Sequence, residues 1–128
     1  MTLKNSLYSI AGKTVEGDTV AYTIALDEHH VIYQAHFPGA PVTPGACIIQ
    51  MAAELLADHL QAGCTIQVVK NAKFVAPLSP LSTPCVKYIF QYSMVDEAPA
   101  RCRMQVQVEA ADTLFAKLTI ICKVCAHE

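Results

Sequence analysis

The chain has 128 residues, of which 53% are hydrophobic and 16% are charged, and its formal net charge at pH 7 is −2. This composition excludes intrinsic disorder, and the length fits a single domain over residues 1–128. The net charge and the scattered basic residues argue against a nucleic-acid partner. No apolar run reaches the roughly 18 residues of a membrane span, and we expect a cytoplasmic protein without membrane association.

Charged side chains are too few to cover the surface of a domain of this size. The chain has nine Lys and Arg residues and eleven Asp and Glu residues. Apolar surface that remains uncovered is most often buried against another copy of the chain. The composition therefore predicts a homo-oligomer.

The N-terminal part of the sequence predicts a strand followed by a loop-rich connector. Residues 14–26 are rich in β-branched side chains, which partly alternate with others, and this pattern favours a strand. Residues 27–45 contain three prolines and two glycines, which indicate a connector with at most a short helix.

A long helix is predicted over residues 46–63, beginning after Pro44 and ending at Gly63. It is apolar on nearly every side, which is typical of a helix buried all round. Gln50, Glu54 and Asp58 are spaced four residues apart, so they form one narrow polar stripe. Burying such groups costs several kcal/mol unless they find partners. The stripe is therefore either a satisfied structural network or the wall of a cavity.

The C-terminal half predicts a β-sheet. Four segments, near residues 65–76, 84–94, 101–110 and 113–124, are rich in β-branched and aromatic residues and are separated by short turns. Short connections favour antiparallel pairing. One long helix before a run of strands predicts the α+β class, with the helix packed on the sheet.

The six cysteines do not predict a metal site. Only Cys122 and Cys125 approach the spacing of metal ligands, and they lie in a predicted strand, where residues three apart point to opposite faces. We expect the cysteines to act as small buried hydrophobic residues in a reducing compartment.

A histidine in the connector is the strongest candidate for proton transfer. His36 precedes the predicted helix by ten residues, in a segment rich in Pro and Gly. Histidine suits proton transfer near neutral pH. The free amides at a helix start, here those of Gly45 or Ala46, suit a carbonyl oxygen that acquires negative charge.

The segment AHFPGAPVTPGACIIQMAAEL resembles the signature of the β-hydroxyacyl-acyl-carrier-protein dehydratases of the hot-dog fold. That signature is His-Phe-Pro-Gly-x-Pro-x-x-Pro-Gly, followed by a helix that carries a catalytic acid. The matching residues are His36, Phe37, Pro38, Gly39, Pro41, Pro44 and Gly45. The segment NAKFVAPLSP, residues 71–80, is similar to the strand and Pro-containing turn of the same family.

This resemblance implies an antiparallel sheet wrapped around one long central helix. It also implies a homodimer, or an assembly of dimers, with active sites at the interface where His36 of one subunit faces the helix of the other. The implied substrate is a (3R)-hydroxyacyl thioester on the phosphopantetheine of an acyl carrier protein, in fatty acid or related lipid or polyketide synthesis. No cofactor and no metal are implied.

The resemblance also implies roles for individual residues. His36 is the expected catalytic base, and a backbone amide at Gly45 or Ala46 is the expected donor to the thioester carbonyl. The expected substrate-binding residues are Phe37, Gly39, Pro44, Gly45, Ala46 and Met51.

The sequence departs from the family signature at the catalytic acid. Gln50 stands where the family has Glu or Asp, and Glu54, one turn later, stands where many members have Gln. Three outcomes are open: His36 acts as both base and acid while Gln50 positions the hydroxyl, Glu54 acts as the acid, or dehydration is lost. The alternatives to a dehydratase are a non-catalytic acyl-thioester-binding or partner subunit and a thioesterase of the same fold.

Overall fold

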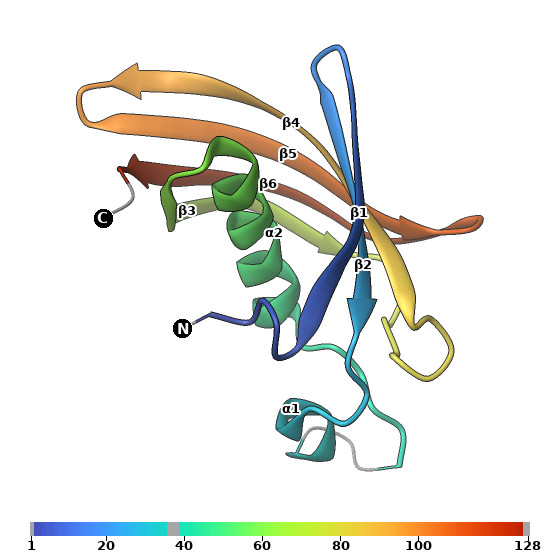
Figure 1. Ribbon diagram of the computed structural model, residues 1–128. Coiled ribbons are helices and arrows are strands. Elements are labelled where there is room, and N and C mark those ends of the chain that lie inside the picture. The colour runs from blue at the N-terminus through green and yellow to red at the C-terminus, as the bar shows by residue number, and fades with distance from the viewer. Residues whose placement is uncertain (1, 36–38, 127–128) are drawn as a thin grey trace.

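The computed structural model describes residues 2–35 and 39–126. Within these residues the chain forms one sheet and two helices (Figure 1). The strands are β1 (Tyr8–Glu16), β2 (Thr19–Leu26), β3 (Gly63–Phe74), β4 (Cys85–Glu97), β5 (Ala100–Ala110) and β6 (Thr113–Cys125), and the helices are α1 (Val31–Ala35) and α2 (Gly45–Leu60).

The sheet is antiparallel throughout, with the strand order β1-β2-β4-β5-β6-β3. It curves around α2, which lies along one face (Figure 1). The predicted α+β hot-dog architecture, an antiparallel sheet wrapped around one long helix, is therefore confirmed. Strands β1 and β3 form the two edges of the sheet.

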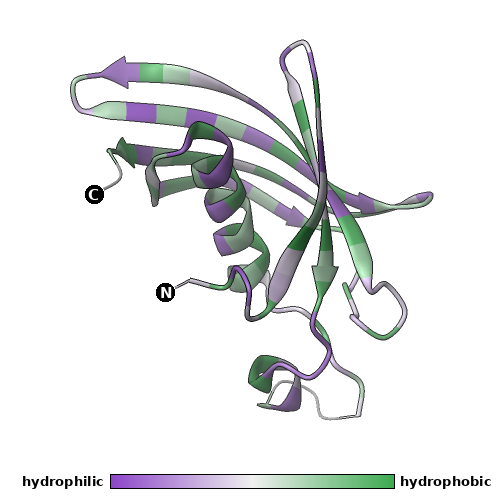
Figure 2. Ribbon diagram, viewed as in Figure 1, coloured by the Kyte–Doolittle hydropathy of each residue, from purple (hydrophilic) through white to green (hydrophobic). Residues whose placement is uncertain are grey.

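The face of the sheet toward α2 carries the hydrophobic core. Along β5, buried and exposed side chains alternate from Cys102 to Val108, and Figure 2 shows the matching alternation of hydropathy. This period of two is what a strand with one buried face requires. The helix contributes its own fully buried side chains to the same core, Met51, Leu55 and Leu56.

The prediction of one strand over residues 14–26 is wrong, because the chain reverses within it. Strand β1 ends at Glu16 and β2 begins at Thr19, with Val15 opposite Val20 in the antiparallel register. Gly17 has a φ of 57°, in the left-handed region that glycine adopts without strain. The Gly17-Asp18 pair is therefore a tight hairpin turn, and such a pair between two β-rich runs is itself a turn signal.

Helix α2 ends earlier than predicted. It begins at Gly45 and stops at Leu60, where Gln61 adopts the left-handed conformation with a φ of 52° and donates its backbone amide to the carbonyl oxygen of Ala57. Gly63, the predicted stop, is instead the first residue of β3. No helix in the part of the chain that the structure describes is long and apolar enough to cross a membrane.

The cysteines are free thiols. Cys102 and Cys122 are fully buried on opposed positions of β5 and β6. Burial raises the pKa of Cys122 to about 12 and that of Cys64 to about 11. Because the thiolate is the reactive form, neither thiol is a strong nucleophile near neutral pH.

A buried pair of hydroxyl groups fixes the two ends of the connector relative to each other. The hydroxyl of Tyr33, in α1, lies 2.8 Å from Oγ1 of Thr43, just before α2. Both residues are buried, and the backbone amide of Thr43 donates to the carbonyl oxygen of Leu78 at 2.8 Å. The segment between α1 and α2 is thus anchored on both sides of residues 36–38.

We expect Tyr33→Phe to lower the free energy of unfolding by about 1–2 kcal/mol, because the buried Thr43 hydroxyl loses its partner. Thr43→Val should have a similar cost for the converse reason. The double variant should cost less than the sum of the two, since it leaves neither hydroxyl unpaired. Urea denaturation of the four proteins measures this coupling, and strictly additive costs would contradict it.

Candidate active site

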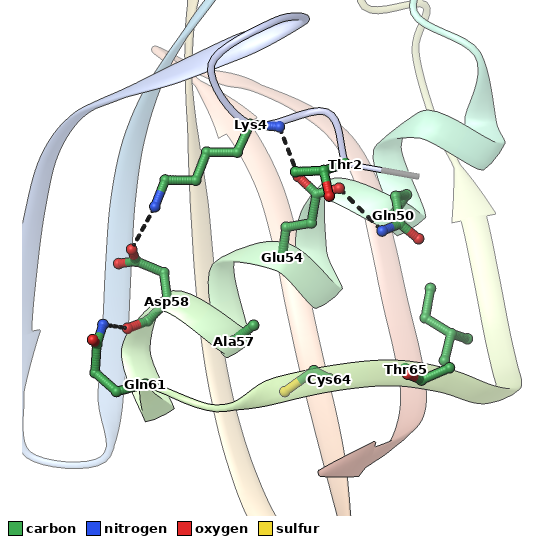
Figure 3. A pocket seen from close by; sticks show the side chains of 10 residues that line it. Thr2, Lys4, Gln50, Glu54, Ala57, Asp58, Gln61, Cys64 and Thr65 are labelled. Atoms are coloured by element: carbon green, nitrogen blue, oxygen red, sulfur yellow. Dashed lines mark hydrogen bonds and ion pairs between the residues drawn. The ribbon is translucent and has the colours of Figure 1, made fainter. Parts of the chain in front are cut away.

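The polar stripe of α2 forms one wall of a groove. This stripe groove lies between the N-terminal segment (residues 2–7), α2 and the start of β3, and its volume is about 570 Å³ (Figure 3). It is lined by Thr2, Lys4, Gln50, Glu54, Ala57, Asp58, Gln61, Cys64, Thr65 and Ile66. All three members of the predicted stripe therefore face the same space.

The carboxylate of Glu54 is held by four groups from two parts of the chain. The backbone amides of Leu3 and Lys4 each donate to it at 2.8 Å, and the hydroxyl of Tyr8 donates at 3.0 Å. The side-chain amide of Gln50 donates to Oε2 at 3.0 Å (Figure 3). Burial, together with the neighbouring carboxylate, raises the pKa of Tyr8, so this hydroxyl keeps its proton and remains a donor.

Asp58 forms a second anchor one turn further along α2. It accepts hydrogen bonds from the ammonium group of Lys4 at 2.9 Å and from the hydroxyl of Tyr22 at 2.6 Å. Burial by itself would raise the pKa of Asp58, but the hydrogen bonds from Tyr22 and Lys4 outweigh it, and the pKa is lowered. Burial and this contact raise the pKa of Tyr22.

The two interpretations of the stripe are therefore both correct. Glu54 and Asp58 are satisfied by donors from β1, β2 and the N-terminal segment, as in a structural network. The same side chains, with Gln50, also line the stripe groove. A satisfied network thus provides one wall of a cavity and fixes how its side chains are oriented.

A second groove lies at the start of α2. This helix-start groove has a volume of about 350 Å³, and its lining includes no charged side chain. It is lined by Val42, Thr43, Pro44, Gly45, Ile48, Phe74, Val75, Ala76, Pro77 and Leu78. An apolar groove next to a helix start, whose first amides have no partner within the helix itself, suits a ligand with an apolar body and a polar carbonyl group.

The ring of Phe74 lies against the backbone of Gly45. A Cβ atom at residue 45 would be only 2.8 Å from Cζ of Phe74 and 3.0 Å from its Cε2, so this contact requires glycine. Phe74 remains 47% exposed although it is a large aromatic residue. It therefore forms an apolar wall of the helix-start groove.

The structure locates most of the residues expected to form the site. Pro44 and Gly45 line the helix-start groove, and Ala46 is exposed in the first turn of α2. Gly39 lies in a turn with a φ of 85°. His36, Phe37 and Pro38 lie outside the described residues.

Met51 is not placed where a substrate-binding residue was expected. It is fully buried in the core, and its sulfur lies 3.8 Å from the hydroxyl of Tyr88. The physical reason is that Met51 faces the sheet, whereas Gln50 and Glu54 face the stripe groove. In this chain Met51 is a packing residue.

The expected site residues are divided between the two grooves. Gln50 and Glu54 line the stripe groove, whereas Pro44 and Gly45 line the helix-start groove. Among the grooves found in the described residues, none holds both sets. A site that uses both sets has to extend over both grooves.

Sequence reasoning missed several residues that shape these grooves. Tyr8 and Tyr22 are buried and donate to the stripe, although they are 46 and 36 positions away from their acceptors. Phe74 was noted only as part of a strand. The polar stripe itself was the available sequence signal. Buried carboxylates require donors and buried tyrosine hydroxyls require acceptors, so the stripe indicated that such donors lie elsewhere in the chain.

A family model described as ApeI-like, ApeI dehydratase, matches residues 12–98. The chain is similar to the structure of the dehydratase heterocomplex ApeI:P from Xenorhabdus doucetiae, with 19% sequence identity, a TM-score of 0.62 and coverage of 91% of this chain and 96% of that chain. A thioesterase from Haemophilus influenzae is similar at 15% identity, with a TM-score of 0.62 and coverage of 94% and 80%, respectively. Curated proteins give no match. At these identities the two structures establish the fold.

We expect Gly45→Ala to act differently with and without the Phe74 ring. In a Phe74→Ala background it should stabilise the protein by about 0.4–1 kcal/mol, because alanine lowers the conformational entropy of the unfolded chain. With Phe74 present the gain should be smaller, because the new methyl group displaces the ring. Thermal or urea unfolding of the four proteins gives the coupling, and an equal effect in both backgrounds would contradict the contact.

The stability difference between the native chain and Asp58→Asn should depend on pH. Because the pKa of Asp58 is lower in the folded protein than its ordinary value of 3.8, the unfolded chain takes up the proton first as the pH falls. The stabilisation by Asp58 is therefore complete well above pH 4 and is lost as the pH falls through the lowered pKa. Urea denaturation between pH 7 and pH 3 tests this, and a pH-independent difference would contradict it.

Proposed function

This chain belongs to the ApeI-like family of dehydratases, and we propose that it acts on acyl thioesters by dehydratase-type chemistry. The proposed substrate is a (3R)-hydroxyacyl group on the phosphopantetheine of an acyl carrier protein. The observation that carries this proposal is the position of Gln50. Its amide lines a groove on α2 at the place where the dehydratase signature has its acid.

In the proposed reaction, one histidine carries out both proton transfers. The imidazole of His36 takes the α-proton of the thioester, and the electron pair forms the α,β double bond as the β-hydroxyl leaves. The resulting imidazolium returns the proton to the departing oxygen, which leaves as water. Gln50 orients the hydroxyl, because an amide forms hydrogen bonds but does not supply a catalytic proton.

The geometry of Glu54 argues against its use as the acid. Both of its oxygens already accept hydrogen bonds, Oε1 from Lys4 and Tyr8 and Oε2 from Leu3 and Gln50. A protonated oxygen would have to give up at least one of these acceptor positions. This supports the outcome in which His36 acts as base and acid.

We further propose that two chains combine to form each site. The helix-start groove, with the Gly45 amide as the proposed thioester carbonyl donor, is separate from the stripe groove of the same chain. Strand β3 is an edge strand and exposes Val68 and Val69, at 39% and 44%. Pairing of this edge with a second copy would cover both side chains and extend the sheet.

A non-catalytic partner subunit is the second candidate. It is favoured by the absence of a carboxyl group at residue 50 and by the engagement of Glu54 with the N-terminal segment. The similar ApeI:P structure is a dehydratase heterocomplex. In this role the chain would bind acyl thioesters, or complete the site of a homologous subunit, without turnover.

An assay of the hydration of a trans-2-enoyl-acyl-carrier-protein tests the two candidates. The decrease in enoyl absorbance measures the rate of this reaction. We expect His36→Ala to lower the rate at least 100-fold, because general acid–base catalysis contributes about 10²- to 10⁴-fold. His29→Ala is the matched control, since this histidine is exposed in a turn, and it should retain the rate. We expect Gln50→Glu to be tolerated or faster.

The outcomes of this assay separate the candidates. Activity that is lost in His36→Ala and retained in His29→Ala supports the dehydratase. No turnover across several chain lengths, with acyl-thioester binding still measurable by calorimetry, supports the partner subunit. Release of free thiol from a saturated acyl thioester would instead indicate a thioesterase.

A further inference from the structure

We propose that the face of the sheet turned away from α2 is the docking surface for the acidic face of the carrier protein that brings the acyl thioester. This outer basic surface consists of Lys73 on β3, Arg103 on β5, and Lys117 and Lys123 on β6. The inference rests on the proposed function and deepens it, because it names the surface that recognises the protein part of the substrate.

The sheet gathers basic residues that are scattered in the sequence. All four side chains are exposed, and on β5 and β6 they alternate with buried core residues such as Cys102 and Leu118. Because neighbouring residues of a strand point to opposite faces, the basic side chains lie on the face away from α2 (Figure 1). Neither β3 nor β6 contains Asp or Glu, although the net charge of the chain is −2.

The arrangement of these charges does not serve the stability of the sheet. Lys73 lies directly opposite Lys117 in the register of β3 and β6. Like charges directly opposite each other destabilise a sheet, whereas opposite charges stabilise it. The same sheet places Lys87 opposite Glu109, which is the favourable arrangement. Carboxylates of a partner would neutralise the repulsion between Lys73 and Lys117.

A polar groove crosses the strands next to Lys117. Its volume is about 500 Å³, and Lys117 is the one charged residue among those of the described chain that line it. Four of the other lining residues carry side-chain amides, Asn71, Gln91, Gln105 and Gln107. Amides both donate and accept hydrogen bonds, so they match the mixed polar groups of a protein surface. A surface of phosphate groups offers mainly acceptors and matches this groove less well.

The spacing of the basic groups along β6 suits an acidic helix. Lys117 and Lys123 are six residues apart in one strand, which is about 20 Å. A helix of about 13 residues spans the same length, so one helix lying along β6 would reach both ammonium groups. A second copy of this chain fits poorly, because a twofold contact of this surface with itself brings the basic groups together.

One end of the outer basic surface lies beside the helix-start groove. Lys73 immediately precedes Phe74, whose ring forms a wall of that groove on the opposite face of the sheet. In the part of the chain that the structure describes, β3 is the outermost strand on this side of the sheet. The flexible phosphopantetheine arm of a docked carrier protein therefore has to pass only one strand of this chain to bring the thioester to Gly45.

Titration of the isotope-labelled native chain with an apo acyl carrier protein, followed by nuclear magnetic resonance, tests the docking. This probe lacks the phosphopantetheine arm, so it reports on the protein surface and not on the grooves. We expect backbone amide signals of β5, β6 and β3 to shift, and salt to weaken the binding. The double variant Lys117→Gln with Lys123→Gln should bind about tenfold more weakly, because two charge pairs are lost. Its stability to urea should not fall, since Lys117 no longer repels Lys73.

Lys13→Gln with Lys87→Gln is the matched control. It changes the net charge by the same amount, but Lys13 lies over the ring of Tyr22 and Lys87 lies opposite Glu109. This variant should bind the apo carrier protein as the native chain does. Equal weakening in the two double variants, signal shifts confined to other elements, or no binding of the native chain would overturn the proposal. Tighter binding to vesicles of phosphatidylcholine and phosphatidylglycerol than to the carrier protein would also overturn it.

Kinetics with two substrates separate the docking from the proposed function. Lys117→Gln with Lys123→Gln should raise KM for a trans-2-enoyl-acyl-carrier-protein about tenfold and leave kcat unchanged. KM for the same enoyl group on pantetheine alone should not change. An equal rise in KM for both substrates would overturn the docking. If neither substrate is turned over although the apo carrier protein binds to the outer basic surface, the proposed function fails and the docking stands.

Discussion

The carboxylate of Glu54, half-buried midway along α2, organises the polar side of this molecule. A carboxylate in such a place is tolerated only if donors surround it. The chain supplies them from the amides of Leu3 and Lys4, from the hydroxyl of Tyr8 and from the amide of Gln50. The N-terminal segment therefore lies across the helix because Glu54 needs donors, and the stripe groove has its shape because that segment lies there.

The start of α2 is subject to a different constraint, because the ring of Phe74 packs directly against the backbone of Gly45. Because Gly45 has no Cβ atom, the exposed ring of Phe74 can lie against it, and a groove without charged side chains forms beside them. One end of α2 is thus apolar, while its middle is rich in acceptors. A long acyl thioester, with a polar carbonyl and a β-hydroxyl on an apolar chain, matches this division better than a uniformly polar ligand does.

Sequence reasoning could predict the helix, its polar stripe and the four C-terminal strands, because each is a local pattern with a period of 3.6 or 2 residues. It did not separate β1 from β2, because the turn signal of the Gly17-Asp18 pair was passed over in a segment otherwise rich in β-branched residues. The substrate-binding role of Met51 came from the family resemblance, and a resemblance does not tell which face of an apolar helix meets the sheet in this chain. The backbone donors to Glu54, those of Leu3 and Lys4, are 51 and 50 positions away in sequence, and no local pattern encodes that contact.

The exchange of Gln and Glu along the stripe is best understood as one change rather than two. A carboxylate at residue 54 accepts hydrogen bonds from the backbone amides of Leu3 and Lys4, and also from the side chain of residue 50, one turn closer to the helix start. With Glu54 held in this way, Gln50→Glu would place two carboxyl groups in contact at the spacing of one helical turn. Like charges that close raise the pKa of the introduced carboxyl group and so favour its protonated form. A protonated carboxyl group is what the dehydratase acid must be, so the network that suits an amide at residue 50 also prepares that position for an acid.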